Sequence, residues 1–241
     1  MKVQKKLTPC PIIDALIELR FTSKVPANAV YGVVFKELNA RYPKVQNLPV
    51  LQFPEAIRLK DPNLKYSPYY KHSNNEFVTQ VGPSVFSLSS FPVYAGWKRF
   101  SEEIFNCINL LKKLEFIDRV ERFGIRYVNR FDFEIIGYTN FRAELAGSEL
   151  VGRNTFVRTE YQNGEFISLL QMGNNILPVK DAKNKLASVI DIDTSIADAS
   201  KLQGFLSNPA EIVEASHNLN KELFYALLNE KISEKIKCEE M

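Results

Sequence analysis

The sequence predicts an α+β protein: a curved antiparallel sheet built from two β-α-β-β-β-α pseudo-repeats, with its helices on one face. Two segments, residues 13–21 and 122–131, alternate apolar and charged side chains with the period of two that is typical of a strand with one buried face. Each is followed by apolar residues at helical spacing and by short strands joined through turn residues. We therefore expect a single domain over residues 1–241, with halves at about 8–115 and 116–236.

The first half is predicted to run strand, helix, short strands and helix. Apolar residues recur at helical spacing from Tyr31 to Tyr42, where Pro43 ends the pattern. Prolines punctuate residues 45–70, which restricts that stretch to short edge strands. In chain order, we expect a strand at 13–21, a helix at 31–42, edge strands within 45–70, strands at 77–81 and 85–89 after a turn at 73–76, and a helix from 97 to about 114.

The second half is predicted to repeat this order. Asn163-Gly164 is the strongest short signal for a β-hairpin, and Asn208-Pro209 is typical of a helix start. The polar tail from Ser233 is expected to fray. We expect strands at 122–131, 155–162, 165–172 and 187–193, a short helix at about 139–150, and a last helix from 209 that buries Ile212, Leu219, Leu223, Ala226 and Leu227.

Short matching segments suggest that the two halves arose by duplication. The turn at residues 74–77 resembles the turn at 163–166, and Arg20-Phe21 ends its strand as Arg130-Phe131 ends the other. The alternative is chance, because strands and helices that alternate in any α+β protein produce such parallels.

Composition places the chain among ordinary globular proteins. Its 31 basic and 28 acidic residues leave a formal net charge of +3, which gives no strong bias toward nucleic acid or an anionic membrane. Cys10, Cys107 and Cys238 are too few and too far apart for a disulfide framework or a zinc site, which favours a reducing compartment. The N-terminus lacks the apolar run of a signal peptide, and no stretch is apolar over the ~20 residues of a spanning helix. We therefore expect a cytoplasmic protein without a membrane segment.

The strand alternation gathers charged side chains on the face opposite the core. Arg122, Arg126 and Arg130 form a row, and guanidinium groups bind carboxylates and phosphates through paired hydrogen bonds. With Asn129 and Trp97, they are the expected contacts for a protein partner or an anionic ligand. The alternative is that acids of neighbouring strands pair with these arginines in ordinary salt bridges. The expected face contains Asp14, Glu18, Arg20, Ser87, Ser89, Arg122, Arg126, Arg130, Asp191 and Asp193, of which Asp14 and Glu18 are further candidate contacts.

Two other positions permit both a structural and a functional interpretation. Gly124 lies in the arginine row, where it either bends the sheet or lets a ligand or backbone approach closely. Trp97, with Tyr94 before it, either anchors a partner or stacks on a base, or else belongs to the core at helical spacing with Phe100 and Ile104.

The sequence contains no catalytic or cofactor-binding motif that we recognise. The pattern Asp14-x-Leu16-x-Glu18-x-Arg20 is faintly similar to the Glu-x-Glu-x-Lys strand of triphosphate-tunnel phosphohydrolases, but Leu16 stands where the second acid is required. His72 and His217 have no Cys or His nearby in sequence, and neither a glycine-rich phosphate loop nor a Gly-x-Ser-x-Gly elbow is present. We therefore predict no metal and no cofactor.

Three segments together resemble a sporadically distributed, functionally uncharacterised family of bacterial and archaeal proteins. They are residues 11–21, with the pattern Pro-x-x-Asp-Ala-x-x-Glu, residues 94–97 with Phe100, and residues 122–129, with the pattern Arg-x-Gly-x-Arg-Tyr-x-Asn. The chain departs from the family in carrying Asp14 where Glu is expected. The resemblance implies no established activity, but sporadic occurrence is typical of accessory systems of the phage-defence or toxin-antitoxin type.

These observations favour a non-enzymatic cytoplasmic binding or adaptor protein that uses the charged face of its sheet. The first alternative is a nucleic-acid or nucleotide binder, in which the arginine row follows phosphates. The second, which the sequence disfavours, is a metal-dependent phosphohydrolase that would bring Asp14, Glu18, Asp191 and Asp193 together.

Overall fold

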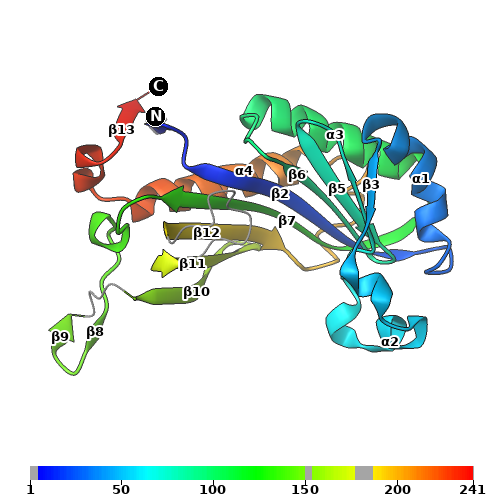
Figure 1. Ribbon diagram of the computed structural model, residues 1–241, viewed down its shortest axis with the longest axis horizontal. Coiled ribbons are helices and arrows are strands. Elements are labelled where there is room, and N and C mark those ends of the chain that lie inside the picture. The colour runs from blue at the N-terminus through cyan, green and yellow to red at the C-terminus, as the bar shows by residue number, and fades with distance from the viewer. Residues whose placement is uncertain (1–4, 150–153, 177–186, 241) are drawn as a thin grey trace. The chain divides into compact units, whose positions relative to one another are not determined.

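A computed structural model describes residues 5–149, 154–176 and 187–240 and confirms the predicted α+β class. Nine strands form one antiparallel sheet in the order β10-β11-β12-β7-β2-β6-β5-β4-β3 (Figure 1). Its strands are β2 (Ile12–Ser23), β3 (Lys44–Asn47), β4 (Tyr70–Ser73), β5 (Phe77–Gly82), β6 (Val85–Ser90), β7 (Ile117–Phe131), β10 (Phe156–Asn163), β11 (Phe166–Ile176) and β12 (Ala187–Ile196). The helices are α1 (Val30–Arg41), α2 (Glu55–Lys60), α3 (Trp97–Lys113) and α4 (Ala210–Leu227), with short 3₁₀ helices η1 (Pro49–Gln52), η2 (Pro62–Leu64), η3 (Ile136–Tyr138) and η4 (Glu230–Glu234).

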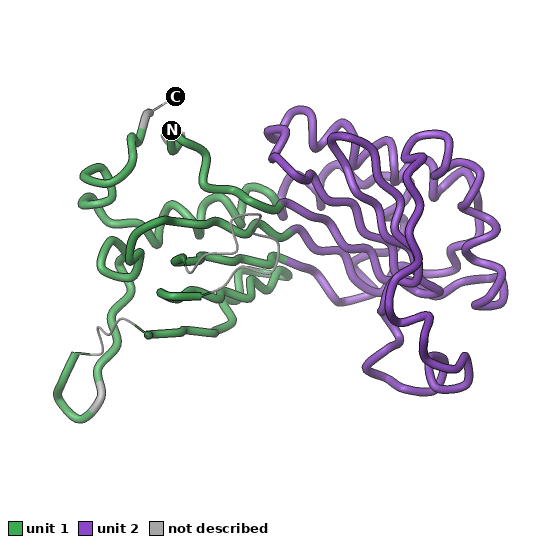
Figure 2. Tube along the Cα trace, in the orientation of Figure 1, with its two compact units in different colours: residues 1–14, 126–194, 217–241 green, residues 15–125, 195–216 purple. Residues whose placement is uncertain are grey.

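The chain divides into two compact units (Figure 2). Unit 1 comprises residues 1–14, 126–194 and 217–241, and unit 2 comprises residues 15–125 and 195–216. These boundaries differ from the predicted halves because β2, β7, β12 and α4 each contribute to both units. The strand order is similar in the two predicted halves. In the first half, β3, β4, β5 and β6 follow one another from one edge of the sheet to β2, and in the second half, β10, β11 and β12 follow one another from the other edge to β7. The duplication of the sequence stays a prediction.

Unit 2 buries the apolar face of its strands under α1 and α3. Ile17, Leu19 and Phe21 of β2 are buried, as the alternation predicts, and α1 contacts β4 and β5 while α3 contacts β6. The buried side chains of α3 include the expected Phe100, Ile104, Ile108 and Leu111. In α1, Phe35 departs from the buried pattern of Val34 and Leu38, because it is 41% exposed.

Unit 1 has its own core, in which α4 packs with β7, β11 and β12. Its buried apolar residues are Leu7, Phe131, Ile135, Ile136, Leu170, Met172, Ile190, Ile192, Phe224 and Ile232. The buried positions of α4 in unit 1 include His217, Asn220 and Phe224, whereas the expected core residue Ala226 is exposed. The amide of Asn220 donates to the carbonyl of Ile192 at 2.8 Å. This bond compensates for burying a polar side chain.

Two further expectations in the second half are wrong. The described part of residues 139–150 is not a helix but the hairpin β8 (Glu144–Leu145) and β9 (Ser148–Glu149), because Ala146 and Gly147 both have the positive φ that closes a two-residue turn. The tail does not fray, since β13 (Lys237–Glu240) pairs with β1 (Lys5–Thr8). Among the described residues, no helix is long and apolar enough to cross a membrane.

Candidate functional site

In unit 2, the first residue of the predicted arginine row, Arg122, binds a carboxylate of the neighbouring strand β2. Arg122 Nη1 lies 3.0 Å from Glu18 Oε1, and Arg20 Nε lies 2.7 Å from the same oxygen. The guanidinium of Arg20 also lies over the ring of Tyr66, 4.5 Å from its centroid. A β-carbon at Gly124 would come within 2.8 Å of Arg122 Nη1. The side chain that approaches Gly124 closely is therefore that of Arg122, from the same strand.

In unit 1, Arg126 is held by a carboxylate in the same way. Arg126 Nε and Nη2 donate to the two oxygens of Asp191 at 2.7 Å and 2.5 Å. The hydrogen bonds to Asp191, and the charges of Asp191, Asp193 and Asp14, raise the pKa of the Arg126 guanidinium above its usual value. Three carboxylates thus act on one arginine.

Arg130, the last residue of the row, and the other expected contacts Asn129 and Trp97 also bind or pack against residues of the same chain. Arg130 Nη1 lies 2.5 Å from Asp132 Oδ1, and the Arg130 side chain is 6% exposed. Asn129 faces the buried side of β7, where its amide donates to the carbonyl of Ile190 at 3.2 Å. Trp97 is half-buried and packs edge-on against Phe100, with 6.5 Å between the ring centroids. These contacts support the salt-bridge interpretation for Arg122 and Arg126, and they leave Asn129 without access to a surface partner.

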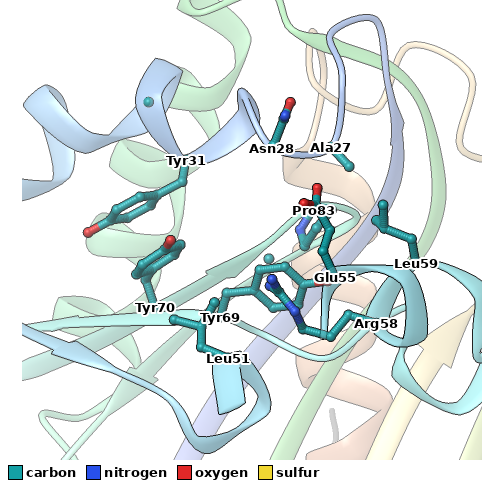
Figure 3. A pocket seen from close by; sticks show the side chains of 12 residues that line it. Ala27, Asn28, Tyr31, Leu51, Glu55, Arg58, Leu59, Tyr69, Tyr70 and Pro83 are labelled. Atoms are coloured by element: carbon teal, nitrogen blue, oxygen red, sulfur yellow. The ribbon is translucent and has the colours of Figure 1, made fainter. Parts of the chain in front are cut away.

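A pocket in unit 2 brings together residues that the sequence did not single out. It has a volume of about 180 Å³. It opens between the start of α1, the strands β4 and β5, and the stretch that contains η1, α2 and η2, which we call the α2 segment (Figure 3). Tyr31 and Tyr70 stack on one side, with 3.5 Å between ring centroids and 7° between ring planes. Its lining is Ala27, Asn28, Tyr31, Gly32, Leu51, Glu55, Arg58, Leu59, Tyr69, Tyr70, Gly82 and Pro83.

Tyr31 is fixed from behind by a buried histidine. His72 Nδ1 lies 3.3 Å from the carbonyl oxygen of Tyr42, so this nitrogen carries the proton and donates. The other ring nitrogen, Nε2, then accepts from the hydroxyl of Tyr31 at 2.9 Å. Burial lowers the pKa of His72, against the opposing effect of its bond to Tyr42, so the ring stays neutral near pH 7. Burial and then the neighbouring Tyr70 raise the pKa of Tyr31.

The opposite wall of the pocket belongs to the α2 segment. The Arg58 guanidinium lies over the ring of Tyr69, 4.6 Å from its centroid, and its Nε donates to the carbonyl of Phe53 at 3.0 Å. Glu55, in contrast, forms no ion pair with any residue that the structure describes. The pocket therefore combines an ordered aromatic surface with one carboxylate that remains available to a ligand.

The same segment carries exposed apolar side chains. It runs through η1, α2 and η2 and stands apart from the sheet (Figure 1). Phe53 is 50% exposed, Ile57 47% and Leu59 53%. The sequence predicts only edge strands here; the signals for α2 are the acidic Glu55 in its first turn and the basic Arg58 and Lys60 in its last turn.

Neither metal chemistry nor known proteins define a site. Among the residues that the structure describes, no three His, Cys, Asp or Glu side chains lie close enough to hold a metal ion. A comparison with protein-family models finds no match, and neither does a comparison with curated proteins.

Proposed function

We propose that the chain is a non-enzymatic cytoplasmic binding protein that holds a protein partner at the unit 2 pocket and the adjoining α2 segment. The observation that carries this proposal is the joining of an aromatic pocket to exposed apolar side chains on one segment. Its partner would insert one apolar side chain between Tyr70 and Leu59 and place a basic group beside Glu55.

The size of the pocket favours a side chain over a cofactor. Pockets that enclose drug-sized ligands and cofactors usually measure about 300–1,000 Å³. The volume of about 180 Å³ is smaller, and the tyrosines and the arginine of its lining are among the residue types that anchor protein interfaces. A single apolar side chain of a partner suits this space.

The exposed side chains of the α2 segment support the same interpretation. Exposed apolar residues that stand singly need no explanation, but a group beside a pocket is typical of an interaction surface. Phe53, Ile57 and Leu59 are such a group, because they lie within seven residues of one another around the helix that forms the pocket wall. Leu59, which lines the pocket, would contact the inserted side chain, and Phe53 and Ile57 would extend the apolar contact beside it.

The arginine row supports a phosphate-binding function less well. Arg122 and Arg126 already bind carboxylates, and the acids around Arg126 would repel a phosphate backbone. The three cysteines form no disulfide, in keeping with a reducing compartment. The family resemblance and a role in an accessory system stay proposals, and neither assigns an activity.

The test is capture of a partner from the native cells by tagged protein, identified by mass spectrometry and quantified by its stoichiometry. Leu59→Asp places a charge at the pocket mouth, and Glu55→Lys reverses the available carboxylate; we expect both to lose the partner at least tenfold. Val93→Asp is the matched control, because Val93 lies in the same unit, is 74% exposed and does not line the pocket. It should retain the partner.

Thermal unfolding of each variant establishes that the loss comes from binding rather than from misfolding. Retention of the partner by Leu59→Asp would contradict the proposal. Loss of the partner in Arg126→Gln with normal capture by Leu59→Asp would place the site on the arginine row instead. Stoichiometric nucleic acid or nucleotide in the purified protein would favour the phosphate-binding alternative.

A further inference from the structure

The strand β10 is a long, exposed edge of the sheet in unit 1 (Figure 1). It contains eight residues and pairs with β11 along their whole length, from Phe156 opposite Gly173 to Asn163 opposite Phe166. Every side chain of β10 is exposed except Val157, which is half-buried, and Phe156 and Tyr161 are 57% and 53% exposed. Such an edge is a template for another strand unless it is short, bulged or covered.

The other edge of the sheet has the protective features that β10 lacks. β3 contains four residues, begins with Lys44 and is followed at once by the proline-started helix η1. Short edge strands, lysines and prolines all discourage pairing with a second chain. The contrast between the two edges indicates that β10 is the edge that can pair with a strand of another chain.

The backbone of β10 identifies the residues that would form the new hydrogen bonds. The carbonyl of Thr155 accepts from the amide of Asn174 in the neighbouring strand at 3.2 Å. In an antiparallel ladder the backbone groups of successive residues point to opposite sides. Odd-numbered residues of β10 therefore bond to β11, and the N–H and C=O groups of Phe156, Arg158, Glu160 and Gln162 point toward the open edge.

The sequence of β10 is complementary to itself in one antiparallel register. When two β10 strands are centred on Thr159, Arg158 of each lies directly opposite Glu160 of the other, and Val157 lies opposite Tyr161. Opposite charges, and aromatic residues facing β-branched residues, are the favourable cross-strand pairs. Neither Arg158 nor Glu160 forms an ion pair with any described residue of its own chain. Both charges are thus available to a second copy.

The neighbouring registers are disfavoured by the same charges. Outward-pointing residues must oppose outward-pointing residues for the hydrogen bonds to form, which permits a shift of the centre by one residue in either direction. A centre on Arg158 places two arginines opposite each other, and a centre on Glu160 places two glutamates together. Like charges directly opposite are destabilising. Among these three registers, only the one centred on Thr159 places each Arg158 opposite a Glu160.

We propose that two copies of this chain associate through β10, in antiparallel register about Thr159, so that their sheets become continuous across a two-fold axis. A two-fold interface requires a surface that is complementary to itself, and this strand has that property. The inference concerns unit 1 and is independent of the pocket in unit 2.

The test is the oligomeric state of the full-length chain, measured by sedimentation velocity across a concentration series. We expect the wild-type chain to be dimeric. Arg158→Glu alone and Glu160→Arg alone each create two like-charge pairs and should raise the dimer dissociation constant about tenfold or more. The double variant Arg158→Glu/Glu160→Arg should dimerise as the wild type does, because it exchanges the charges and restores both pairs.

Mixing the two single variants provides the sharpest measurement. Each alone carries charges of one sign at both positions, so neither self-associates well, whereas the mixture should form heterodimers with both ion pairs restored. Circular dichroism of the single variants checks their folding, and the restored association excludes misfolding as the cause of the loss. A wild-type chain that stays monomeric at all concentrations, single variants that dimerise normally, or a mixture that stays monomeric would each overturn the proposal.

Discussion

Unit 1 and unit 2 each bury a tyrosine hydroxyl, but they satisfy it in different ways. In unit 2, the hydroxyl of Tyr42 donates to the carboxylate of Glu103, which also accepts from Arg41 at 2.9 Å and from Asn106 at 3.2 Å. In unit 1, the hydroxyl of Tyr127 lies 2.9 Å from Nδ1 of His217. In unit 2 the tyrosine therefore binds a buried carboxylate whose arginine partner is 40% exposed, and in unit 1 it binds a buried uncharged histidine.

The two arrangements respond to acid in different pH ranges. Burial alone would raise the pKa of Glu103, but hydrogen bonds from Tyr42, Asn106 and Arg41 outweigh it and hold that pKa below its usual value. Burial, and then the charge of Lys221, lower the pKa of His217 to about 4. The Tyr42–Glu103 pair thus loses its stabilising effect only where carboxylates protonate, whereas the Tyr127–His217 pair begins to lose it where an unfolded histidine protonates.

Removing the carboxylate of Glu103 is the largest change that we expect. Glu103→Ala leaves the buried hydroxyl of Tyr42 without its acceptor and removes the charged acceptor of Arg41 and Asn106. Hydrogen bonds to a charged group contribute about 1.5–3 kcal/mol each, so we expect a loss of about 3–5 kcal/mol in the free energy of unfolding. Denaturant titration at pH 7 measures this cost. Glu102→Ala is the matched control, since Glu102 is the exposed neighbour on the same helix, and its loss should change stability by less than about 0.5 kcal/mol. Equal costs for both variants would contradict a stabilising role of the buried Glu103 carboxylate.

The protonation of His217 should give the next largest effect. Its pKa is about 4 in the folded chain and 6.5 in the unfolded chain, so the unfolded state binds more protons between these values. The free energy of unfolding is therefore undiminished above pH 6.5 and falls toward pH 4, in total by about 3 kcal/mol for this group. Denaturant titrations from pH 7 to pH 5 should show a slope that His217→Gln reduces. An unchanged slope in this variant would mean that His217 is protonated in the folded chain.

The sequence predicted well what depends on alternation and poorly what depends on polar burial. The strand of residues 13–21 and the arginine-bearing strand were recognisable because their apolar faces are continuous along the chain. The buried stripe of α4 was placed partly on the wrong residues, because Ser216, His217 and Asn220 occupy core positions that an apolar pattern does not count. Ser216 donates to the carbonyl of Ile212 in the same helix, whereas the partners of His217 and Asn220 lie in β7 and β12, where no local pattern reveals them.

The pocket of unit 2 illustrates the same limit at the candidate site. Its walls come from the start of α1, from α2 and from the β4–β5 strands, which are far apart in sequence and meet only after the sheet has formed. Tyr31 begins the apolar pattern that predicts the helix at residues 31–42, and nothing local indicates that it stacks on Tyr70. The arginine row, conversely, was conspicuous in the sequence, yet cross-strand carboxylates already bind Arg122 and Arg126.

The smallest predicted effect concerns only one of the two arginine–carboxylate pairs. Gly124 contacts Arg122 of the Arg122–Glu18 pair in unit 2, and the Arg126–Asp191 pair in unit 1 serves for comparison. In Gly124→Ala, the new β-carbon would lie 2.8 Å from Arg122 Nη1, so the flexible guanidinium must move and its 3.0 Å contact with Glu18 weakens. A partly exposed pair of this kind contributes under about 1 kcal/mol, and we expect a loss of that order in denaturant titration. In a Glu18→Gln background the same substitution should cost almost nothing, because the contact that it disturbs is already lost. An equal cost in both backgrounds would mean that Gly124 serves the backbone of β7 rather than the position of Arg122. In Gly32→Ala, where nothing lies within 4 Å of the new β-carbon, we expect a gain in stability instead, because alanine favours the helix that glycine weakens.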